Sequence, residues 1–382
     1  MKILFFVIVL VFSVVNAEPY EPKNDGFVLL SLLNDSSYSE VKHFKQTLKN
    51  DPGNSLVALD LAKIYISKAK NQNDPRYYGL AEKVIKPWWG NNNHPDILFV
   101  QAGILEHDHK FSQALKVLNL LNKSRQSAQV SLMNANIHQI LGQYDAAKRA
   151  CSDLMIKVSA LITAGCFISV EGFTSSSDKV NIMIAQLLNL LKISKDSPLD
   201  TQLWVRGLIS EVASMTNKWL VAEEVLIEGL KEKPNDTYLL SIYADLLLKQ
   251  NRLKACVSLL KPYIEQTTLL VRYLAANDRL SQVDSSFPEE NYLESRIRED
   301  EVKSDERHLR EYAYYQLYVK KDYSTALRNA LTNWNNQKEL IDSLILYRAA
   351  FKLKDQASLK LLSDWKEQNH VQINFDSQAL KI

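Results

Sequence analysis

One short stretch of this sequence combines side chains that could hold a metal ion. Glu106, His107, Asp108 and His109 follow one another, and imidazoles and carboxylates are common zinc ligands. Alternate positions of a turn can reach a single ion, but no second set of such residues recurs at a fixed spacing elsewhere in the sequence. The pattern therefore favours an exposed loop between two helices, and we expect neither a metal nor a cofactor.

Motifs that indicate catalysis are scarce. The sequence has no glycine-rich phosphate loop and no Gly-x-Ser-x-Gly motif, and it contains only ten glycines and seven histidines. One acidic candidate is Glu294, in the segment Tyr292-Leu293-Glu294-Ser295, which would act as a general acid if it lay in a cleft. No catalytic domain with a glycine-rich motif follows it. We therefore expect no enzymatic activity and no catalytic residue.

The composition is that of a folded helical protein without a strong electrostatic field. Of the 382 residues, 46% are hydrophobic and 24% are charged, and the net charge is +2. This balance argues against nucleic acid or an anionic membrane as partner. With only ten prolines and ten glycines, the chain has too few turn residues for a β-sandwich of this length.

The first 17 residues have the features of a secretory signal. Lys2 gives a positive start, residues 3–15 are apolar except for Ser13, and Ala17 occupies a position suited to signal peptidase. We expect cleavage after Ala17 and a periplasmic or secreted protein, with an uncleaved anchor as the alternative. No later segment approaches 18 apolar residues without a charge, so we expect no transmembrane segment in the mature chain. Residues 18–34 form an N-terminal segment.

A pattern of three residues recurs along the rest of the chain. A small residue is followed nine positions later by a bulky one and then, three positions later, by a second small one. Four segments show the whole pattern: Ala102-Phe111-Ala114, Ala135-Tyr144-Ala147, Ser210-Trp219-Ala222 and Ala244-Leu253-Cys256. Tyr78, Phe111 and Tyr144 are spaced by 33 residues, and Trp219 and Leu253 by 34. Two larger gaps, of 75 and 70 residues, are close to twice this period, so each contains one degenerate unit.

This period has a simple structural explanation. Two helices of about a dozen residues pack antiparallel, with small residues where they cross and the bulky residue filling the gap between them. Stop signals fall between the expected helices, as at Pro52-Gly53, Gly142 and Pro234. A single pair cannot bury its apolar face, so pairs stack into a superhelix. The sequence therefore predicts an all-α protein, an α-solenoid of stacked antiparallel helix pairs.

A helix pair of 33 or 34 residues with these helix-stop signals resembles the tetratricopeptide repeat. The resemblance covers residues 35–365 as eight to ten helix pairs and leaves residues 366–382 as a C-terminal tail. Single motifs are degenerate, since Ala62, Ala102, Ala135 and Ala244 stand where the family usually has glycine. Another kind of α-solenoid is the alternative. With the signal, the resemblance implies an exported bacterial protein with a tetratricopeptide-like superhelix.

In such arrays the first helices of successive pairs line a concave face that binds an extended peptide, a helix or a polymer. Counting back from each turn places seven residues on this face: Gln129, Asn136, Gln139, Trp204, Glu211, Tyr238 and Asp245. Positions seven apart, such as Tyr238 and Asp245, lie on one helical stripe. The resemblance thus implies binding through these side chains, and a stripe that is merely solvated is the alternative.

Two further features could carry function. Trp88 and Trp89 are adjacent in an unusual loop, residues 87–95, and either form an aromatic surface for a partner or cover the edge of the solenoid. Cys151 and Cys166 lie on consecutive helices of the predicted stack, so an exported chain could join them in a disulfide. Two buried small side chains are the alternative, and we interpret Cys256 as a packing residue.

We therefore expect an exported, non-catalytic scaffold that binds a protein or peptide partner on its concave face. A solenoid that binds carbohydrate or cell wall through exposed tryptophans is one alternative. The other is an enzyme similar to the lytic transglycosylases, exported helical solenoids whose catalytic glutamate precedes a serine, as Glu294 precedes Ser295.

Overall fold

The computed structural model describes residues 38–72, 74–91, 93–124, 127–281, 288–303 and 305–375. In these ranges the chain folds into nineteen α-helices and contains no β-strand. The expected signal (residues 1–17) and N-terminal segment (residues 18–34) lie outside the described residues. None of the described helices is long and apolar enough to span a bilayer.

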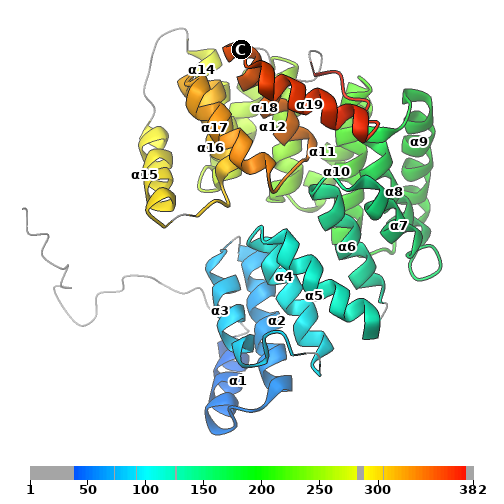
Figure 1. Ribbon diagram of the computed structural model, residues 1–382, viewed down its shortest axis with the longest axis vertical. Coiled ribbons are helices and arrows are strands. Elements are labelled where there is room, and N and C mark those ends of the chain that lie inside the picture. Colours follow the sequence, from blue (N-terminus) through cyan, green and yellow to red (C-terminus); the bar gives the residue numbers. More distant parts are fainter. Residues whose placement is uncertain are drawn as a thin grey trace, which may run out of the picture.

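Figure 1 shows the helices following one another along the described part of the chain. Their bounds are α1 Tyr38–Asn50, α2 Ser55–Gln72, α3 Arg76–Ile85, α4 Pro95–His107, α5 Phe111–Ser124, α6 Ala128–Ile140, α7 Tyr144–Ser152, α8 Ala160–Thr174, α9 Ser177–Ile193, α10 Leu199–Met215, α11 Trp219–Glu232, α12 Thr237–Lys249, α13 Leu253–Leu260, α14 Thr267–Leu280, α15 Pro288–Lys303, α16 Leu309–Tyr315, α17 Tyr323–Trp334, α18 Leu340–Leu353 and α19 Gln356–Gln368. Short 3₁₀ turns follow α3 (Lys86–Trp88) and α13 (Lys261–Tyr263), and a π-helical turn (Gln316–Lys320) extends α16.

The helices after α1 form nine consecutive pairs, α2 with α3 through α18 with α19, and the two members of each pair pack together. The first helices of neighbouring pairs also pack side by side from α6 to α18. The two degenerate units expected in the sequence gaps are the pairs α8–α9 and α14–α15. The predicted all-α solenoid is therefore confirmed.

The residues of the repeat occupy the positions that their size predicts. The small residues at the helix crossings are almost completely buried: Ala102, Ala114, Ala135, Ala147, Ser210, Ala222, Ala244 and Cys256. In each of the four complete segments, the bulky residue is the first residue of the second helix in its pair, as Phe111 is in α5 and Tyr144 in α7. The residue two positions before each of them adopts a left-handed conformation, for example Gly142 and Asn217. A left-handed residue ends one helix and lets the chain reverse into the next.

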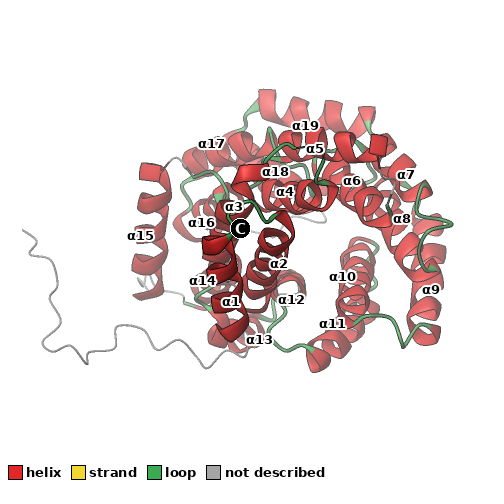
Figure 2. Cartoon of the chain, turned by 90° about the horizontal axis from the view of Figure 1, so that it is seen from below, coloured by secondary structure: helices red, strands yellow, loops and turns green. Residues whose placement is uncertain are grey.

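The superhelix closes on itself, which the period alone does not reveal. The backbone N–H of Lys338, between α17 and α18, donates to the Ile140 carbonyl at the end of α6, at 2.7 Å. The N–H of Gln372, after α19, donates to the Phe173 carbonyl in α8, also at 2.7 Å. A single hydrophobic core consequently joins α6–α8 to the C-terminal helices. Figure 2 shows the helices following one another in a curved array.

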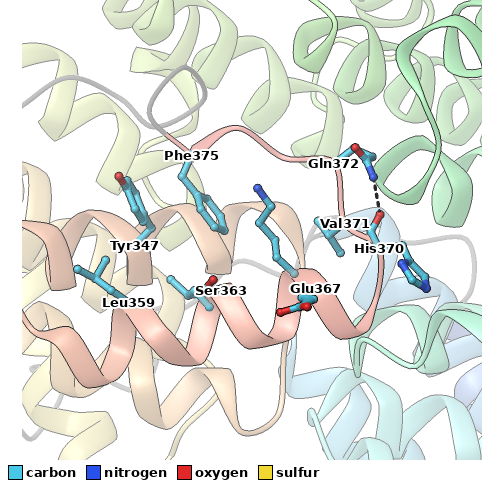
Figure 3. Close-up of a pocket in the computed structure, with 10 residues that line it drawn as sticks. Tyr347, Leu359, Ser363, Glu367, His370, Val371, Gln372 and Phe375 are labelled. Carbon is cyan, nitrogen blue, oxygen red and sulfur yellow. Dashed lines mark hydrogen bonds between the residues drawn. The ribbon is translucent and has the colours of Figure 1, made fainter.

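The described end of the chain takes part in this closure. After α19 ends at Gln368, the segment through Phe375 folds back over α18, and Val371 and Ile373 are buried. The Phe375 ring stacks on Tyr347 with 4.8 Å between ring centroids, and Lys366 Nζ donates to the Ile373 carbonyl at 2.6 Å. A shallow pocket of about 520 Å³ lies beneath this segment (Figure 3). Residues 369–375 of the expected tail thus pack on the array.

Candidate functional site

The first helices of the pairs from α6 to α18 contribute side chains to one common cavity. On α12, Tyr238, Ser241, Asp245 and Lys249 follow at helical spacing and line the same cavity. Residues three, four and seven apart share a face of a helix. Because α10, α12, α14, α16 and α18 are neighbours in the stack, these faces form one continuous concave wall.

The cavity at the centre of this wall has a volume of about 240 Å³ and is lined from α6 through α18. A wider groove of about 1170 Å³ lies between α2–α4 and the N-terminal ends of α10, α12 and α14. Tyr238 and Thr268 line both spaces, so the groove and the cavity adjoin at these two residues. The aromatic side chains of Tyr78, Phe99 and Trp204 line the groove.

Two helical glycines position the aromatic residues of the concave face. A Cβ atom at Gly207 in α10 would lie 2.1 Å from a ring carbon of Tyr238, and one at Gly165 in α8 would lie 2.8 Å from the Trp204 ring. Only a residue without a side chain allows such a close approach. The Tyr238 ring therefore lies across the α10 backbone, and its hydroxyl donates to Glu211 Oε2 at 3.1 Å, one turn further along α10.

Replacing Gly207 with alanine is expected to destabilise the fold by about 1–2 kcal/mol. Displacing the Tyr238 ring carries an overpacking cost of about 1–3 kcal/mol, which exceeds the gain of about 1 kcal/mol in helix propensity. Thermal unfolding followed by circular dichroism measures the difference. Gly79→Ala in α3 is the matched control, because nothing lies within 4 Å of its added Cβ, and it should raise the melting temperature. Equal effects of the two substitutions would contradict the close packing of Tyr238.

Buried ion pairs surround the cavity. Arg272, only 5% exposed, binds Asp245 through two hydrogen bonds of 2.9 and 2.7 Å. Arg310 binds Asp342 through bonds of 2.6 and 2.8 Å and also contacts Glu339. Bidentate pairing of this kind fixes both side chains and partly offsets the cost of burying their charges. The cavity wall is therefore charged and rigid.

Glu211 has a different environment from these paired acids. Burial raises its pKa to about 8, and the negative charges of Glu339 and Asp245 act in the same direction. The hydrogen bond from Tyr238 and the charge of Arg310 oppose this increase without cancelling it. Glu211 therefore carries a proton at neutral pH, so its carboxyl group can donate as well as accept a hydrogen bond.

The structure gathers some of the seven expected concave-face residues and separates others. Four of them, Gln139, Glu211, Tyr238 and Asp245, line the cavity. Trp204 and Tyr238 line the groove. Gln129 and Asn136 line neither space: Gln129 is exposed, and Asn136 Nδ2 donates to Glu106 Oε1 at 2.7 Å.

Three of the four consecutive metal-ligand candidates contact residues elsewhere in the fold, and the fourth, Asp108, pairs with His107 at 3.3 Å and with Lys110 at 2.9 Å. Glu106 accepts a hydrogen bond from Asn136. The His107 ring stacks on the Tyr78 ring with 3.6 Å between ring centroids. His109 is hydrogen bonded to Gln337 at 2.7 Å. Within the described residues, no group of three or more histidine, cysteine or acidic side chains is placed to hold a metal. These residues instead link α4 to its neighbours.

The other chemical candidates also have structural partners. Trp88 and Trp89 are half-buried against the N-terminal hydrophobic core, and Lys86 Nζ lies 4.8 Å from the Trp89 ring centroid. Glu294 pairs with Lys320 at 3.0 Å and accepts from the Tyr315 hydroxyl at 3.1 Å. The bond to Lys320 lowers the pKa of Glu294, whereas a general acid needs a raised pKa.

Cys151 in α7 and Cys166 in α8 form a disulfide that spans 15 positions of sequence, and Cys256 is buried at its helix crossing. Removing the disulfide with the double substitution to alanine is expected to destabilise the fold by about 2–3 kcal/mol, because the crosslink restricts the unfolded chain. Urea unfolding of the oxidised protein and of the variant measures this loss. Cys256→Ala is the control, and its effect relative to wild type should be the same with and without reductant, because Cys256 takes no part in the crosslink. Unchanged stability of the double variant under oxidising conditions would exclude a stabilising crosslink.

Four functional residues were not predicted from the sequence: Gly165, Gly207, Arg272 and Arg310. A glycine inside a helix is unfavourable by about 1 kcal/mol relative to alanine, so the two helical glycines were a usable signal for close packing. The arginines gave no such signal, because the partner of Arg310 lies 32 positions away and is reached only after α17 returns the chain.

Comparisons with known proteins add little to this description. No family model matches the chain, and no curated protein matches it. Among solved structures, the chain is similar to one in the crystal structure of the APC/C hetero-tetramer Cut9-Hcn1, with 12% sequence identity and a TM-score of 0.42. That alignment covers 86% of this chain and 68% of the other. The repeat period, the helix pairing and the buried small residues, all properties of the chain itself, make it a tetratricopeptide-like α-solenoid.

Proposed function

We propose that this protein is a non-catalytic scaffold that holds a protein or peptide partner on its concave face. The observation that carries the proposal is a wide groove on this face that adjoins the cavity and shares Tyr238 and Thr268 with it as lining residues. A groove of about 1170 Å³ is large enough for several residues of an extended chain. Small-molecule pockets are typically about 300–1000 Å³.

The side chains along the groove suit a peptide. Tyr78, Phe99 and Trp204 provide aromatic surface, and aromatic residues are enriched where proteins bind one another. Polar side chains lie beside these rings, since Ser67, Asn235 and Gln266 also line the groove.

Selection of random displayed peptides against the purified protein tests the proposal. Peptides that bind should lose at least about tenfold in affinity with Trp204→Ala, because truncating a central aromatic anchor typically removes about 1.4 kcal/mol or more. Leu220→Ala is the control, since Leu220 is 77% exposed on α11 and lines neither groove nor cavity. Selected peptides that bind both variants with unchanged affinity would place the partner elsewhere, and retention of glycans in place of peptides would favour a carbohydrate-binding solenoid.

We also propose that the scaffold works outside the cytoplasm. The apolar start of the sequence, with Lys2 before it and Ala17 after it, supports export. The Cys151–Cys166 disulfide supports an oxidising compartment. N-terminal sequencing of protein recovered from the extracytoplasmic fraction should begin at Glu18. Recovery of the intact Met1 start in the membrane fraction would indicate an uncleaved anchor.

A further inference from the structure

The closure of the array rests on contacts of two different kinds. The first lies in the loop between α17 and α18, where Lys338 donates to the Ile140 carbonyl at 2.7 Å. Gln337 beside it is only 4% exposed and is hydrogen bonded to Arg310 at 2.6 Å and to His109 at 2.7 Å. Buried polar side chains with several partners hold a loop in one position. We call this contact the pivot.

The C-terminal part of α19 meets the array at the same place. A Cβ atom at Gly142 would lie 3.0 Å from Lys338 and 3.2 Å from Trp365. The Trp365 ring also lies 6.4 Å from the Tyr144 ring in α7, measured between centroids. The pivot therefore fixes the beginning of α18 and the C-terminal part of α19, whereas the turn between these two helices, residues 354–355, lies at their other ends.

The second contact is made by the segment after α19, residues 369–375, which we call the strap. Within it, residues 371–374 form neither helix nor strand. Their side chains alternate in burial: Val371 and Ile373 are 3% and 2% exposed, whereas Gln372 between them is exposed. This alternation is typical of an extended peptide that lies in a groove and directs every second side chain into it.

The strap connects α8 to α18. The N–H of Gln372 donates to the Phe173 carbonyl at 2.7 Å, and the Phe375 ring stacks on Tyr347 at 4.8 Å (Figure 3). Phe173 lines the cavity of the concave wall, and so does Leu344, which lies one turn before Tyr347 in α18. The strap therefore joins two parts of the cavity wall that are far apart in the sequence.

The strap is packed less completely than the pivot. A shallow pocket of about 520 Å³ lies between it and the α18–α19 pair, lined by Tyr347, Leu359, Val371 and Phe375 among others. A second pocket, of about 440 Å³, follows residues 371–375. Atoms that face a space lose attractive contacts, and a segment with few packed neighbours opens more readily than a core. The strap is therefore the part of the closure that separates first.

We infer that the strap is a latch. It holds the α18–α19 pair against α8, and its release lets this pair rotate about the pivot and increases the distance between α8 and α18. Because Phe173 and Leu344 line the cavity from these two helices, release also opens the cavity wall. The latch does not depend on which partner the groove holds, so it stands or falls separately from the proposed function.

The distance between two spin labels in the full chain tests the latch. Ser177→Cys at the start of α9 and Ala357→Cys at the start of α19 are exposed labelling sites, and Cys256→Ala removes the free thiol. Electron–electron double resonance should give a single narrow distance distribution. Adding Ile373→Asp should raise the ratio of open to closed molecules by at least about a hundredfold and move the distribution to longer distances, because docking the strap would bury an unpaired charge.

Gln372→Asp is the matched control, because it places the same charge at the neighbouring position of the strap, where the side chain is exposed, and keeps the backbone N–H. Its distance distribution should equal that of the native strap. A distribution in Ile373→Asp that stays at the native distance would overturn the latch, and so would an equal shift in both variants. If Ile373→Asp loses helix content by circular dichroism, Phe375→Ala decides instead: it removes the ring on Tyr347 without adding a charge and should shift the distribution in the same direction.

Hydrogen exchange separates rotation about the pivot from unfolding. In Ile373→Asp the Gln372 amide should lose its protection, because its bond to the Phe173 carbonyl is broken, whereas the Lys338 amide at the pivot should stay protected. Loss of protection at both amides would mean that the closure opens as one unit, and a latch that acts separately from the pivot would be wrong.

Discussion

Replacing Arg310 with methionine is expected to lower the free energy of unfolding by about 3–5 kcal/mol, the typical cost of breaking a buried ion pair from one side. Arg310 donates to both carboxylate oxygens of Asp342, at 2.6 and 2.8 Å, and to Gln337 Oε1 at 2.6 Å. Asp342 is only 3% exposed, so the substitution leaves its charge buried without a cation. Urea unfolding followed by circular dichroism measures the loss.

An exposed ion pair provides the matched control for this substitution. Arg252 donates to both oxygens of Glu223 at 2.7 Å, but its side chain remains 42% exposed. Solvent screens such a pair, so Arg252→Met should change stability by less than about 1 kcal/mol. Arg310→Lys should recover only part of the stability, because lysine keeps the charge but cannot bind a carboxylate in the bidentate manner. Equal losses in Arg310→Met and Arg252→Met would show that burial of the Asp342 pair contributes nothing.

Replacing Glu211 with glutamine is expected to stabilise the protein at pH 8 by roughly 3–5 kcal/mol and to leave its stability nearly unchanged at pH 4.5. Glutamine has the shape of a protonated glutamate and cannot ionise. Folding raises the pKa of Glu211 from 4.5 to about 8, and each tenfold change in an ionisation constant corresponds to about 1.4 kcal/mol of free energy. Denaturant unfolding of both proteins between pH 4.5 and pH 9 measures the difference.

The sign of this effect follows from the protons bound in each state. Between pH 4.5 and pH 8 the folded protein holds a proton on Glu211 that the unfolded chain has released. The contribution of this group to stability is therefore complete below the unfolded pKa and is lost as the pH rises to the folded pKa. Above pH 8 both states are ionised, and the difference between wild type and variant should become constant.

The test compares the stability of wild type and Glu211→Gln at each pH, because other groups also titrate between pH 4.5 and pH 9. Burial lowers the pKa of His109 to about 4 and that of Lys249 to about 8. These two groups add stability as the pH rises, in the opposite direction to Glu211, but they are present in both proteins and cancel in the comparison. A difference that does not change between pH 4.5 and pH 8 would mean that Glu211 ionises as it does in solution.

The helix starts and helix crossings of each repeat could be predicted from the sequence, because they depend on contacts between helices that are close in the sequence. The spacing from Phe111 to Tyr144 fixes where each second helix begins, and the small residues Ala114 and Ala147 fix where helices cross. These interactions connect residues within one pair or between adjacent pairs, so a local pattern contains them. Glu211, Tyr238 and Asp245 were placed on the concave face by the same counting, and they line one cavity.

The partners of these residues could not be read from the pattern. Asp245 is an acid at a concave position, but its charge is matched by Arg272, which comes from the next pair in the stack. Asn136 also fits the stripe, yet it donates to Glu106 across the α4–α6 boundary. Side-chain pairing depends on the rotation between successive helix pairs, and hydrophobic periodicity does not encode that rotation.

The sequence by itself determined that this chain is an array of helix pairs and how often the unit recurs, and it identified some of the side chains that line the cavity, such as Glu211 and Tyr238. Only the tertiary structure decided that the array closes, with Lys338 bonded to Ile140 and Gln372 to Phe173. Small rotations between pairs add up along a solenoid, so whether pairs far apart in the sequence meet depends on the sum of these rotations. That closure encloses the cavity around Glu211 and thereby gives a solvated stripe of polar residues the burial that changes its chemistry.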